Sequence, residues 1–124
     1  MKEIRYPRCD SEFEIQAELF YALQRAGVRV RGEVISSVEE FGRKHTVRLD
    51  LVIFNRLNQA IAIIECKNVK EHNGATAPVM FQSNKRQGRR YRLFEIPVFQ
   101  CVSKAHIPTV IEAVLGYIDK QLAA

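Results

Sequence analysis

Apolar residues recur at helical spacing near both ends of the chain. Ser11 and Glu14 have the spacing of a capping box, and the apolar positions after them predict a first helix over residues 11–26, which Gly27 ends. Pro108 opens a second amphipathic stretch, which predicts the last helix. The apolar stripe of this last helix consists of Val110, Ile111, Val114, Leu115, Ile118 and Leu122. Each helix therefore has one apolar face to bury.

Three strands are predicted between these helices. Apolar and polar residues alternate over residues 28–34, which is typical of a strand with one face in water. Residues 36–46 are mostly polar and predict a turn. Residues 47–54 and 60–64 are apolar and rich in β-branched side chains, and the polar residues between them favour a hairpin of two buried strands.

The second half of the chain adds one more helix and one more strand before the last helix. Residues 79–94 have the pattern of a helix, although Gly88 inside it costs roughly 1 kcal/mol relative to Ala. Residues 98–102 follow Pro97 and predict a fourth, short strand. The order is therefore helix, three strands, helix, strand, helix, which predicts an α/β fold.

Length and charge limit the possible classes of protein. At 124 residues and 47% hydrophobic, the chain fits a single domain over residues 1–124 with enough apolar material for a core. The formal net charge of +5 permits a polyanionic partner without requiring one. The strongest basic cluster falls within eight residues and consists of Lys85, Arg86, Arg89, Arg90 and Arg92.

The cysteines and histidines form no recognisable framework. Cys9, Cys66 and Cys101 are odd in number and far apart, which matches neither a disulfide scaffold nor a paired zinc signature. Reduced thiols in a cytoplasmic protein are the simplest interpretation, and no stretch approaches the ~20 apolar residues of a membrane span. We therefore expect a soluble protein without a membrane partner. The three histidines are expected at the surface: His45, His72 and His106.

Two acids and a lysine interrupt the apolar strands. Asp50 lies inside one apolar run, and Glu65 ends the next, with Lys67 two residues later. Because side chains alternate along a strand, one face of the second run is formed by Ile61, Ile63, Glu65 and Lys67. A buried carboxylate is costly without a partner, and conflicts between pattern and chemistry tend to mark functional sites.

A hard divalent cation is one partner that both carboxylates could share. Asp50 and Glu65 offer oxygen ligands, the backbone carbonyl of Cys66 could add another, and water and a phosphate oxygen would complete a magnesium shell. The ion would polarise a phosphoryl group and activate water. Lys67 could orient that water or stabilise charge developing in the transition state. The alternative is a plain salt bridge between Glu65 and Lys67, with Asp50 exposed at a bend.

Two short segments on the hairpin strands form a known motif: Arg48-Leu49-Asp50 and Ile64-Glu65-Cys66-Lys67. Together with the element order, they resemble the PD-(D/E)XK nuclease superfamily, which includes restriction endonucleases, Holliday-junction resolvases and RecB-type nucleases. The resemblance covers nearly the whole chain and implies a restriction-endonuclease-like core, with a central mixed four-stranded sheet flanked by helices. It also implies Asp50 and Glu65 as ligands of Mg²⁺, with Mn²⁺ able to substitute, and Lys67 as the catalytic lysine.

Many members of that superfamily also use a glutamate on the first helix, where this sequence offers Glu12, Glu14 and Glu18. At about 100° per residue, Glu12 falls on the apolar arc of the helix, whereas Glu14 and Glu18 lie on the opposite side. Helical phase therefore selects Glu12, pointing towards the core, as a further metal ligand and catalytic group, and Gln16 faces the same way. The alternative is an acid that the helix dipole favours in the first turn.

Gln87 and Tyr91 are four residues apart and share one face if their segment is helical. Their spacing and position resemble the Gln-x-x-x-Tyr motif that follows the catalytic lysine in RecB-like members. The resemblance implies a place near the site for both, with Gln87 as a catalytic group and Tyr91 as a contact to nucleic acid. The alternative for Tyr91 is an aromatic residue at the core edge.

Basic residues near this pair and near Asp50 could contact nucleic-acid phosphates. Four of them surround the Gln87 and Tyr91 pair: Lys85, Arg86, Arg89 and Arg90. A solvated basic face is the alternative. Arg48 is either a phosphate contact or the ion-pair partner of Asp50.

The pattern favours a metal-dependent DNA nuclease, most simply an endonuclease, in which metal-activated water attacks phosphorus. A chain of 124 residues leaves little room for target recognition, so base readout would fall to residues 36–46 and 71–78, and cutting would be structure-selective or weakly specific. Cutting both strands would favour a homodimer. The alternatives are a catalytically inactive nucleic-acid-binding module of the same fold and a structural or protein-interaction domain.

Overall fold

The computed structural model of the chain describes residues 3–5, 10–68, 76–81, 83 and 85–123. Its elements, in chain order, are α1 (Glu12–Arg25), β1 (Val30–Glu40), β2 (Arg43–Phe54), β3 (Ala60–Cys66), α2 (Arg86–Arg92), β4 (Val98–Cys101), the short 3-10 helix η1 (Lys104–His106) and α3 (Ile107–Ala123). The predicted order of helices and strands is therefore confirmed. No helix among the described residues has both the length and the apolar character needed to cross a membrane.

The four strands form one mixed sheet in the order β1-β2-β3-β4. The first two pairs are antiparallel, and β3 and β4 are parallel. The predicted hairpin of β2 and β3 is confirmed, with Leu51 opposite Ile64. A parallel pair needs a crossover connection, and the chain between β3 and β4 includes α2.

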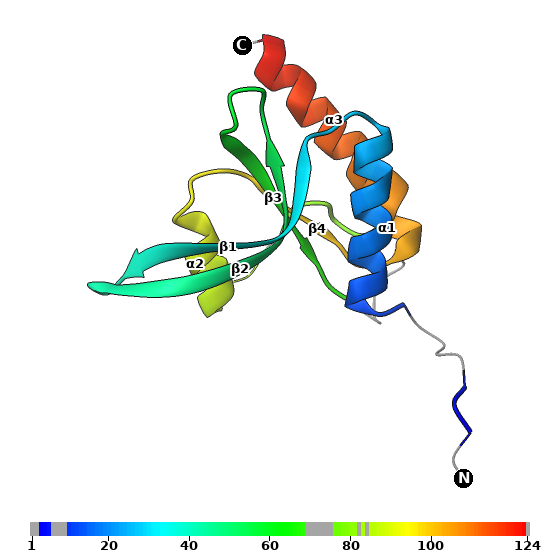
Figure 1. Ribbon diagram of the computed structural model, residues 1–124, viewed down its shortest axis with the longest axis horizontal. Helices are drawn as coiled ribbons and strands as arrows, with labels where there is room; N and C mark the ends of the chain where they lie inside the picture. Colours follow the sequence, from blue (N-terminus) through cyan, green and yellow to red (C-terminus); the bar gives the residue numbers. More distant parts are fainter. Residues whose placement is uncertain (1–2, 6–9, 69–75, 82, 84, 124) are drawn as a thin grey trace.

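Helices cover both faces of the sheet (Figure 1). Helices α1 and α3 bury Leu19 and Val110 against one face, which includes Leu51 and Ile64. On the opposite face Tyr91 of α2 packs in a second cluster, whose buried members are Val38, Val47, Leu49, Val52, Ile63, Tyr91 and Val98. Each fully buried side chain of this size contributes on the order of 1.5–3 kcal/mol, so both helix layers hold the sheet in place.

Helix α1 begins where the capping box predicts. The Ser11 hydroxyl accepts a hydrogen bond from the Glu14 amide at 3.1 Å, which satisfies one of the free amide groups of the first turn. The helix ends before Gly27, whose φ of 82° suits a residue without a side chain.

The predicted turn at residues 36–46 is wrong, because this segment is the distal half of a long β1–β2 hairpin. Pairing continues from Ser36 opposite Val47 to Glu40 opposite Arg43. The segment has few apolar residues because most of its side chains are exposed, but Val38 and Val47 are buried beneath α2. A few contacts from a distant helix therefore suffice to extend a polar strand pair.

The predicted helix over residues 79–94 is much shorter and is confined to α2. Residues before it are extended and pair with β4: Met80 bridges Phe99, the Phe81 amide donates to the Val98 carbonyl at 2.9 Å, and the Gln100 amide donates to the Val79 carbonyl at 2.7 Å. The edge of β4 needs backbone partners, and this requirement overrides the local helical pattern.

Gly88 provides a test of the packing of α2. A Cβ at this position would lie 2.0 Å from the backbone oxygen of Ser83. Helix propensity alone predicts that Gly88→Ala stabilises the chain by roughly 1 kcal/mol. We expect the opposite, a loss of about 2 kcal/mol or more in the free energy of unfolding, because the clash is with backbone. Urea denaturation would measure the sign, and a gain in stability would contradict this packing.

Strand β2 changes face at Asp50. Leu49 belongs to the cluster under α2, whereas Leu51, two residues later, belongs to the cluster under α1 and α3. On β1 the residue opposite Asp50 is Glu33, which has a φ of 55°. The pairs on either side of it are Gly32 with Leu51 and Val34 with Leu49. This local distortion turns the distal hairpin towards α2 and places Asp50 at the bend.

Candidate active site

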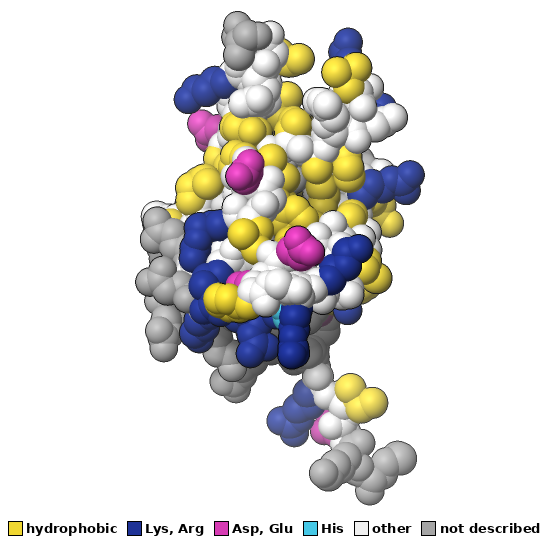
Figure 2. Space-filling view, turned by 90° about the vertical axis from the view of Figure 1, so that its left-hand side faces the viewer, with side chains coloured by type: hydrophobic (Ala, Val, Ile, Leu, Met, Phe, Trp, Pro, Cys, Tyr) yellow, Lys and Arg dark blue, Asp and Glu magenta, His cyan; other side chains and the backbone are white. Residues whose placement is uncertain are grey.

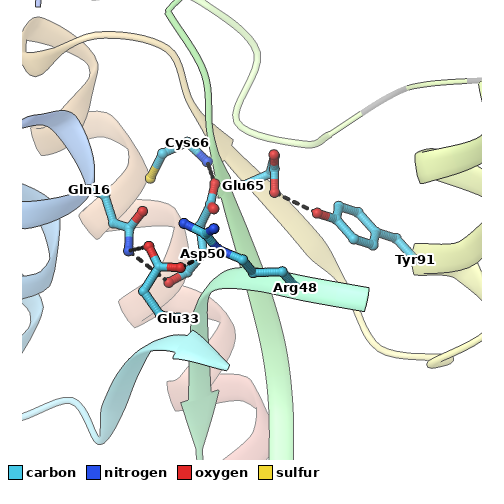
Figure 3. Close-up of polar contacts among 7 residues, drawn as sticks. All are labelled: Gln16, Glu33, Arg48, Asp50, Glu65, Cys66 and Tyr91. Carbon is cyan, nitrogen blue, oxygen red and sulfur yellow. Dashed lines mark hydrogen bonds and ion pairs between the residues drawn. The ribbon is translucent and has the colours of Figure 1, made fainter. Parts of the chain in front are cut away.

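Strands β2 and β3 separate at the two predicted acids. Their pairing ends with Leu51 opposite Ile64, so Asp50 and Glu65 are the next residues on either side. The Cys66 amide donates to Asp50 Oδ2 at 2.9 Å, and the carboxylate thus replaces a backbone partner. Figure 3 shows the two carboxylates at this junction, with Tyr91 on one side and Gln16 and Glu33 on the other. The sheet itself therefore brings both acids together.

Glu65 is buried, with 7% of its surface exposed, and two residues of α2 hold its carboxylate. The Tyr91 hydroxyl donates to Glu65 Oε2 at 2.6 Å, and Gln87 Nε2 donates to Glu65 Oε1 at 3.1 Å. Gln87 Nε2 also lies 2.8 Å from the Tyr91 hydroxyl oxygen. Gln87 and Tyr91, four residues apart on one helix, thus fix the orientation of Glu65.

The two carboxylates lie in a poorly solvated place. Burial, and to a smaller extent the nearby Asp50 charge, raise the pKa of Glu65 to about 7, against the hydrogen bond from Tyr91. Burial also raises the pKa of Asp50. Asp50 lies at the bend of β2 but is half-buried, so the alternative of an exposed Asp50 is wrong. A cation would stabilise the ionised form of two acids that repel each other in such a desolvated place.

Lys67 shares the face of Glu65 on the α2 side of the sheet. Its Nζ lies 4.8 Å from the centre of the Phe81 ring, and that ring packs against Tyr91 with centroids 5.5 Å apart. Among the described residues, Tyr91 and Gln87 rather than Lys67 hydrogen-bond the Glu65 carboxylate, and the Lys67 charge lowers the pKa of Glu65. Ile63 shares this face as predicted, whereas Ile61 packs in the cluster under α1 and α3.

On the other side of Asp50, three polar residues form a network that links α1 to the hairpin. Gln16 Nε2 donates to the Asp50 carbonyl at 3.2 Å and to Glu33 Oε1 at 3.0 Å. Arg48 Nε donates to Glu33 Oε2. Of the two interpretations of Arg48, the ion pair with Asp50 is wrong, because the partner is Glu33. The contact with phosphate stays a prediction. The hydrogen bond from Arg48 lowers the pKa of Glu33, which is thus ionised beside Asp50.

Sequence reasoning missed Glu33. In the pattern of residues 28–34 it is one of several polar positions of a half-exposed strand. The signal that would have found it is register, because a longer β1–β2 hairpin places Glu33 opposite Asp50. That signal was hidden by the prediction of a turn at residues 36–46.

Glu12 is exposed, and the prediction that it points towards the core is wrong. It begins α1, and in this first turn its side chain extends beyond the end of the packed face. Its charge is nevertheless felt at Asp50, where it adds to the rise in pKa that burial causes. Glu14, on the other side of the helix, pairs instead with Lys104 at 3.5 Å.

Basic side chains gather on the face formed by α2 and the distal hairpin (Figure 2). Lys85 and Arg86 are exposed. Arg89 and Arg90 pair with Glu40 of β1 at 3.6 Å and 3.4 Å, which joins α2 to the hairpin. A pocket of ≈ 520 Å³ lies between β2 and α2, and its lining residues are Thr46, Val47, Arg48, Arg86, Gln87, Arg90 and Tyr91. Three guanidinium groups thus line a pocket that includes the two residues holding Glu65.

Two cysteine thiols and one histidine ring are buried among the described residues. Cys66 and Cys101 are buried free thiols, and Cys9 and His72 lie outside the described residues. The prediction of a surface position is wrong for His106, which is fully buried. Its Nδ1 accepts from the Val102 amide at 3.2 Å and its Nε2 lies 2.9 Å from the Ala77 carbonyl, so the ring fixes the end of β4 to the preceding loop.

The donor set at the junction fits a hard cation in chemistry, with two protein carboxylates. Asp50 and Glu65 carry only oxygen donors, and each carboxylate oxygen has a second lone pair beyond the hydrogen bond it accepts. Within the described ranges, no three side chains of His, Cys, Asp or Glu are grouped for a metal, and Glu12 as a further ligand stays a prediction. An ion here would take further ligands from backbone, water or substrate, as Mg²⁺ commonly does.

Comparison of the chain with family models, with curated proteins and with solved structures gave no match. The assignment of a function therefore depends on the geometry of this site.

Tyr91→Phe tests the contact between α2 and Glu65. The ring is fully buried and should keep its packing against Phe81, whereas the hydrogen bond to Glu65 is lost. Because that bond counteracts the effect of burial, we expect the pKa of Glu65 to rise above its present value of about 7. Carboxyl ¹³C NMR titration of both proteins would measure it, and an unchanged or lower pKa would contradict the contact.

Proposed function

We propose that this chain is a metal-dependent DNA nuclease, most simply an endonuclease, with a restriction-endonuclease-like core. One observation carries the proposal: Asp50 and Glu65 meet where β2 and β3 separate, and α2 holds the buried Glu65 carboxylate through Tyr91 and Gln87. Above neutral pH a protein gains no stability from burying a carboxylate whose pKa is raised to about 7. Such an arrangement is typical of a site where function sets the chemistry.

In this proposal Asp50 and Glu65, with the backbone carbonyl of Cys66, hold a Mg²⁺ or Mn²⁺ ion. The bound ion would supply Lewis acidity and a more acidic water. Tyr91 and Gln87 keep the Glu65 carboxylate in one orientation, and Cys66 does the same for Asp50 through its amide. Lys67 contributes positive charge where negative charge develops on the phosphoryl oxygens. The residues of the chain thus act mainly by positioning and electrostatics.

The basic pocket between β2 and α2 supports nucleic acid as the substrate. Arg48, Arg86 and Arg90 line the same pocket as Gln87 and Tyr91. Guanidinium groups bind phosphates without reading bases, so they would hold a strand next to the carboxylates without strong sequence preference. This favours structure-selective or weakly specific cutting.

The experiment is a cleavage assay with purified protein on plasmid, linear and branched DNA in Mg²⁺ or Mn²⁺, with a chelator control. We expect metal-dependent products with at least one of these substrates. Cleavage that survives in Asp50→Ala or Lys67→Ala would contradict the proposal. RNA of matched structure serves as a comparison substrate.

One observation favours the alternative of an inactive nucleic-acid-binding module: the residues that line the basic pocket include neither Asp50 nor Glu65. Calorimetric titration with Mg²⁺ distinguishes the two, because a module without a metal site gives no heat that depends on Glu65. Binding of DNA without cleavage and without such heat would favour the module.

A further inference from the structure

The tip of the β1–β2 hairpin contains an aromatic residue in an unusual backbone conformation. Only Phe41 and Gly42 lie between Glu40, the last residue of β1, and Arg43, the first residue of β2. Their φ angles are 54° and 73°. Positive φ at both positions is the pattern of a type I′ turn, in which Asn-Gly or Asp-Gly is strongly preferred. Gly42 follows this preference and Phe41 does not.

Packing in the folded chain does not offset the energetic cost of this conformation at Phe41. Its side chain is 86% exposed, and it belongs to neither hydrophobic cluster of the described residues. A second turn, between β2 and β3, has the expected choice: Asn58, and not the neighbouring exposed Leu57, adopts the φ of 62°. A bulky side chain held in a disfavoured conformation and in water is a feature from which function can be inferred.

The position of Phe41 shows what it could contact. The hairpin tip extends beyond α2 (Figure 1), and Arg43 and Lys44 follow it on β2 with exposed side chains. The surface around the tip is the basic face of α2, in which Glu40 is paired with Arg89 and Arg90 (Figure 2). An exposed aromatic ring on the same hairpin as these cations suits a partner that combines phosphates with flat apolar rings.

We infer that Phe41 is a wedge that stacks on the bases of a nucleic-acid strand bound along the basic face. Aromatic side chains stack on bases without regard to sequence, and apolar wedges inserted between base steps are a common means of unstacking a duplex. This inference rests on the proposed function for the choice of nucleic acid. It adds a second contact, remote from the carboxylates, that favours distorted or readily unstacked DNA.

The length of the hairpin sets where the wedge would act. Asp50 lies seven residues after Arg43 on β2, which corresponds to roughly 23 Å at ~3.3 Å per residue. At ~3.4 Å per base step, this is about seven base pairs. A strand whose phosphate lies at Asp50 and Glu65 would therefore meet Phe41 roughly two-thirds of a helical turn away.

The test uses the whole chain in a chelating buffer, so that binding is measured without cleavage. The probe is a duplex with several adenines of one strand replaced by 2-aminopurine, whose fluorescence rises on unstacking. We expect the unaltered chain to bind and to raise the fluorescence about two-fold or more. Phe41→Ala should bind about ten-fold more weakly with no rise, and Phe41→Trp should retain both. Leu57→Ala, at a residue 77% exposed in the β2–β3 turn, is the matched control and should behave as the unaltered chain.

Phe41→Asn separates the role of the ring from the role of the turn. Asn suits a positive φ, so we expect a higher melting temperature together with the same loss of unstacking as Phe41→Ala. The inference is overturned if Phe41→Ala binds and unstacks the duplex as well as the unaltered chain does, or if it changes the mass in sedimentation, which would indicate self-association. If the unaltered chain binds no nucleic acid, both the inference and the proposed function fail. If it binds nucleic acid and Phe41→Ala behaves in the same way, only the inference fails, so the two failures are distinguishable.

Discussion

Glu65→Gln is expected to lower the rate of Mg²⁺-dependent DNA cleavage by about a thousand-fold or more, while the chain stays folded. The amide has nearly the same shape, and its oxygen can still accept from Tyr91. It removes the negative charge that the proposed metal site needs. Loss of a preorganised electrostatic contact of this kind costs on the order of 4 kcal/mol in the transition state, which is about a thousand-fold in rate.

Single-turnover cleavage with excess enzyme measures this change without interference from product release. The matched control is Glu112→Gln, which neutralises an exposed acid on α3 and should leave the rate unchanged. Circular dichroism of all three proteins should agree. A folded Glu65→Gln protein that cuts within ten-fold of the unaltered rate would contradict the assigned role.

Stability in the absence of metal is expected to fall as the pH rises from about 4.5 to about 7. Burial raises the pKa of Glu65 from 4.5 to about 7, so the folded state holds the proton more tightly than the unfolded state. The stabilising effect of the protonated Glu65 is complete below the pKa of the unfolded state and is lost as the pH rises through the pKa of the folded state. A difference of this size corresponds to ~3 kcal/mol in the free energy of unfolding. Mg²⁺ should restore stability at pH 8, because it binds the ionised carboxylates of the folded state.

Urea denaturation from pH 4 to pH 8, with chelator or with Mg²⁺, measures both effects. Burial lowers the pKa of His106, so this residue changes the stability with pH in the opposite direction. The relevant quantity is therefore the difference in the free energy of unfolding between the unaltered chain and Glu65→Gln. The variant should show no loss of stability of this kind and little gain from Mg²⁺. If the unaltered chain, relative to the variant, gained stability between pH 5 and pH 7, the environment assigned to Glu65 would be wrong.

The parts of the site that could be predicted from sequence depend on local pattern. Asp50 and Glu65 stand out because each interrupts or ends an apolar run, and strand alternation places Lys67 on the face of Glu65. Helical spacing brings Gln87 and Tyr91 to one side, where the structure has both at Glu65. The length of the helix is not needed for this, because one turn suffices.

The parts that could not be predicted depend on contacts distant in sequence. The network of Gln16, Glu33 and Arg48 requires the register of β1 on β2 and a positive φ at Glu33, and neither follows from residue type. The start of α2 was misplaced because residues 79–81 pair with β4. Gly88 looked like a weak point of a helix and is instead the place where α2 approaches the backbone of Ser83.

The most direct test of the account is the rate of plasmid cleavage in Mg²⁺ by Asp50→Asn and by the unaltered chain. The asparagine oxygen can still accept the hydrogen bond that the Cys66 amide donates to Asp50 Oδ2 in the unaltered chain. The junction of β2 and β3 should therefore persist while one anionic ligand is lost. We predict metal-dependent conversion of supercoiled plasmid by the unaltered chain and no detectable conversion by Asp50→Asn over the same time. Equal rates from two folded proteins would contradict the assignment of Asp50 and Glu65 as a hydrolytic metal centre.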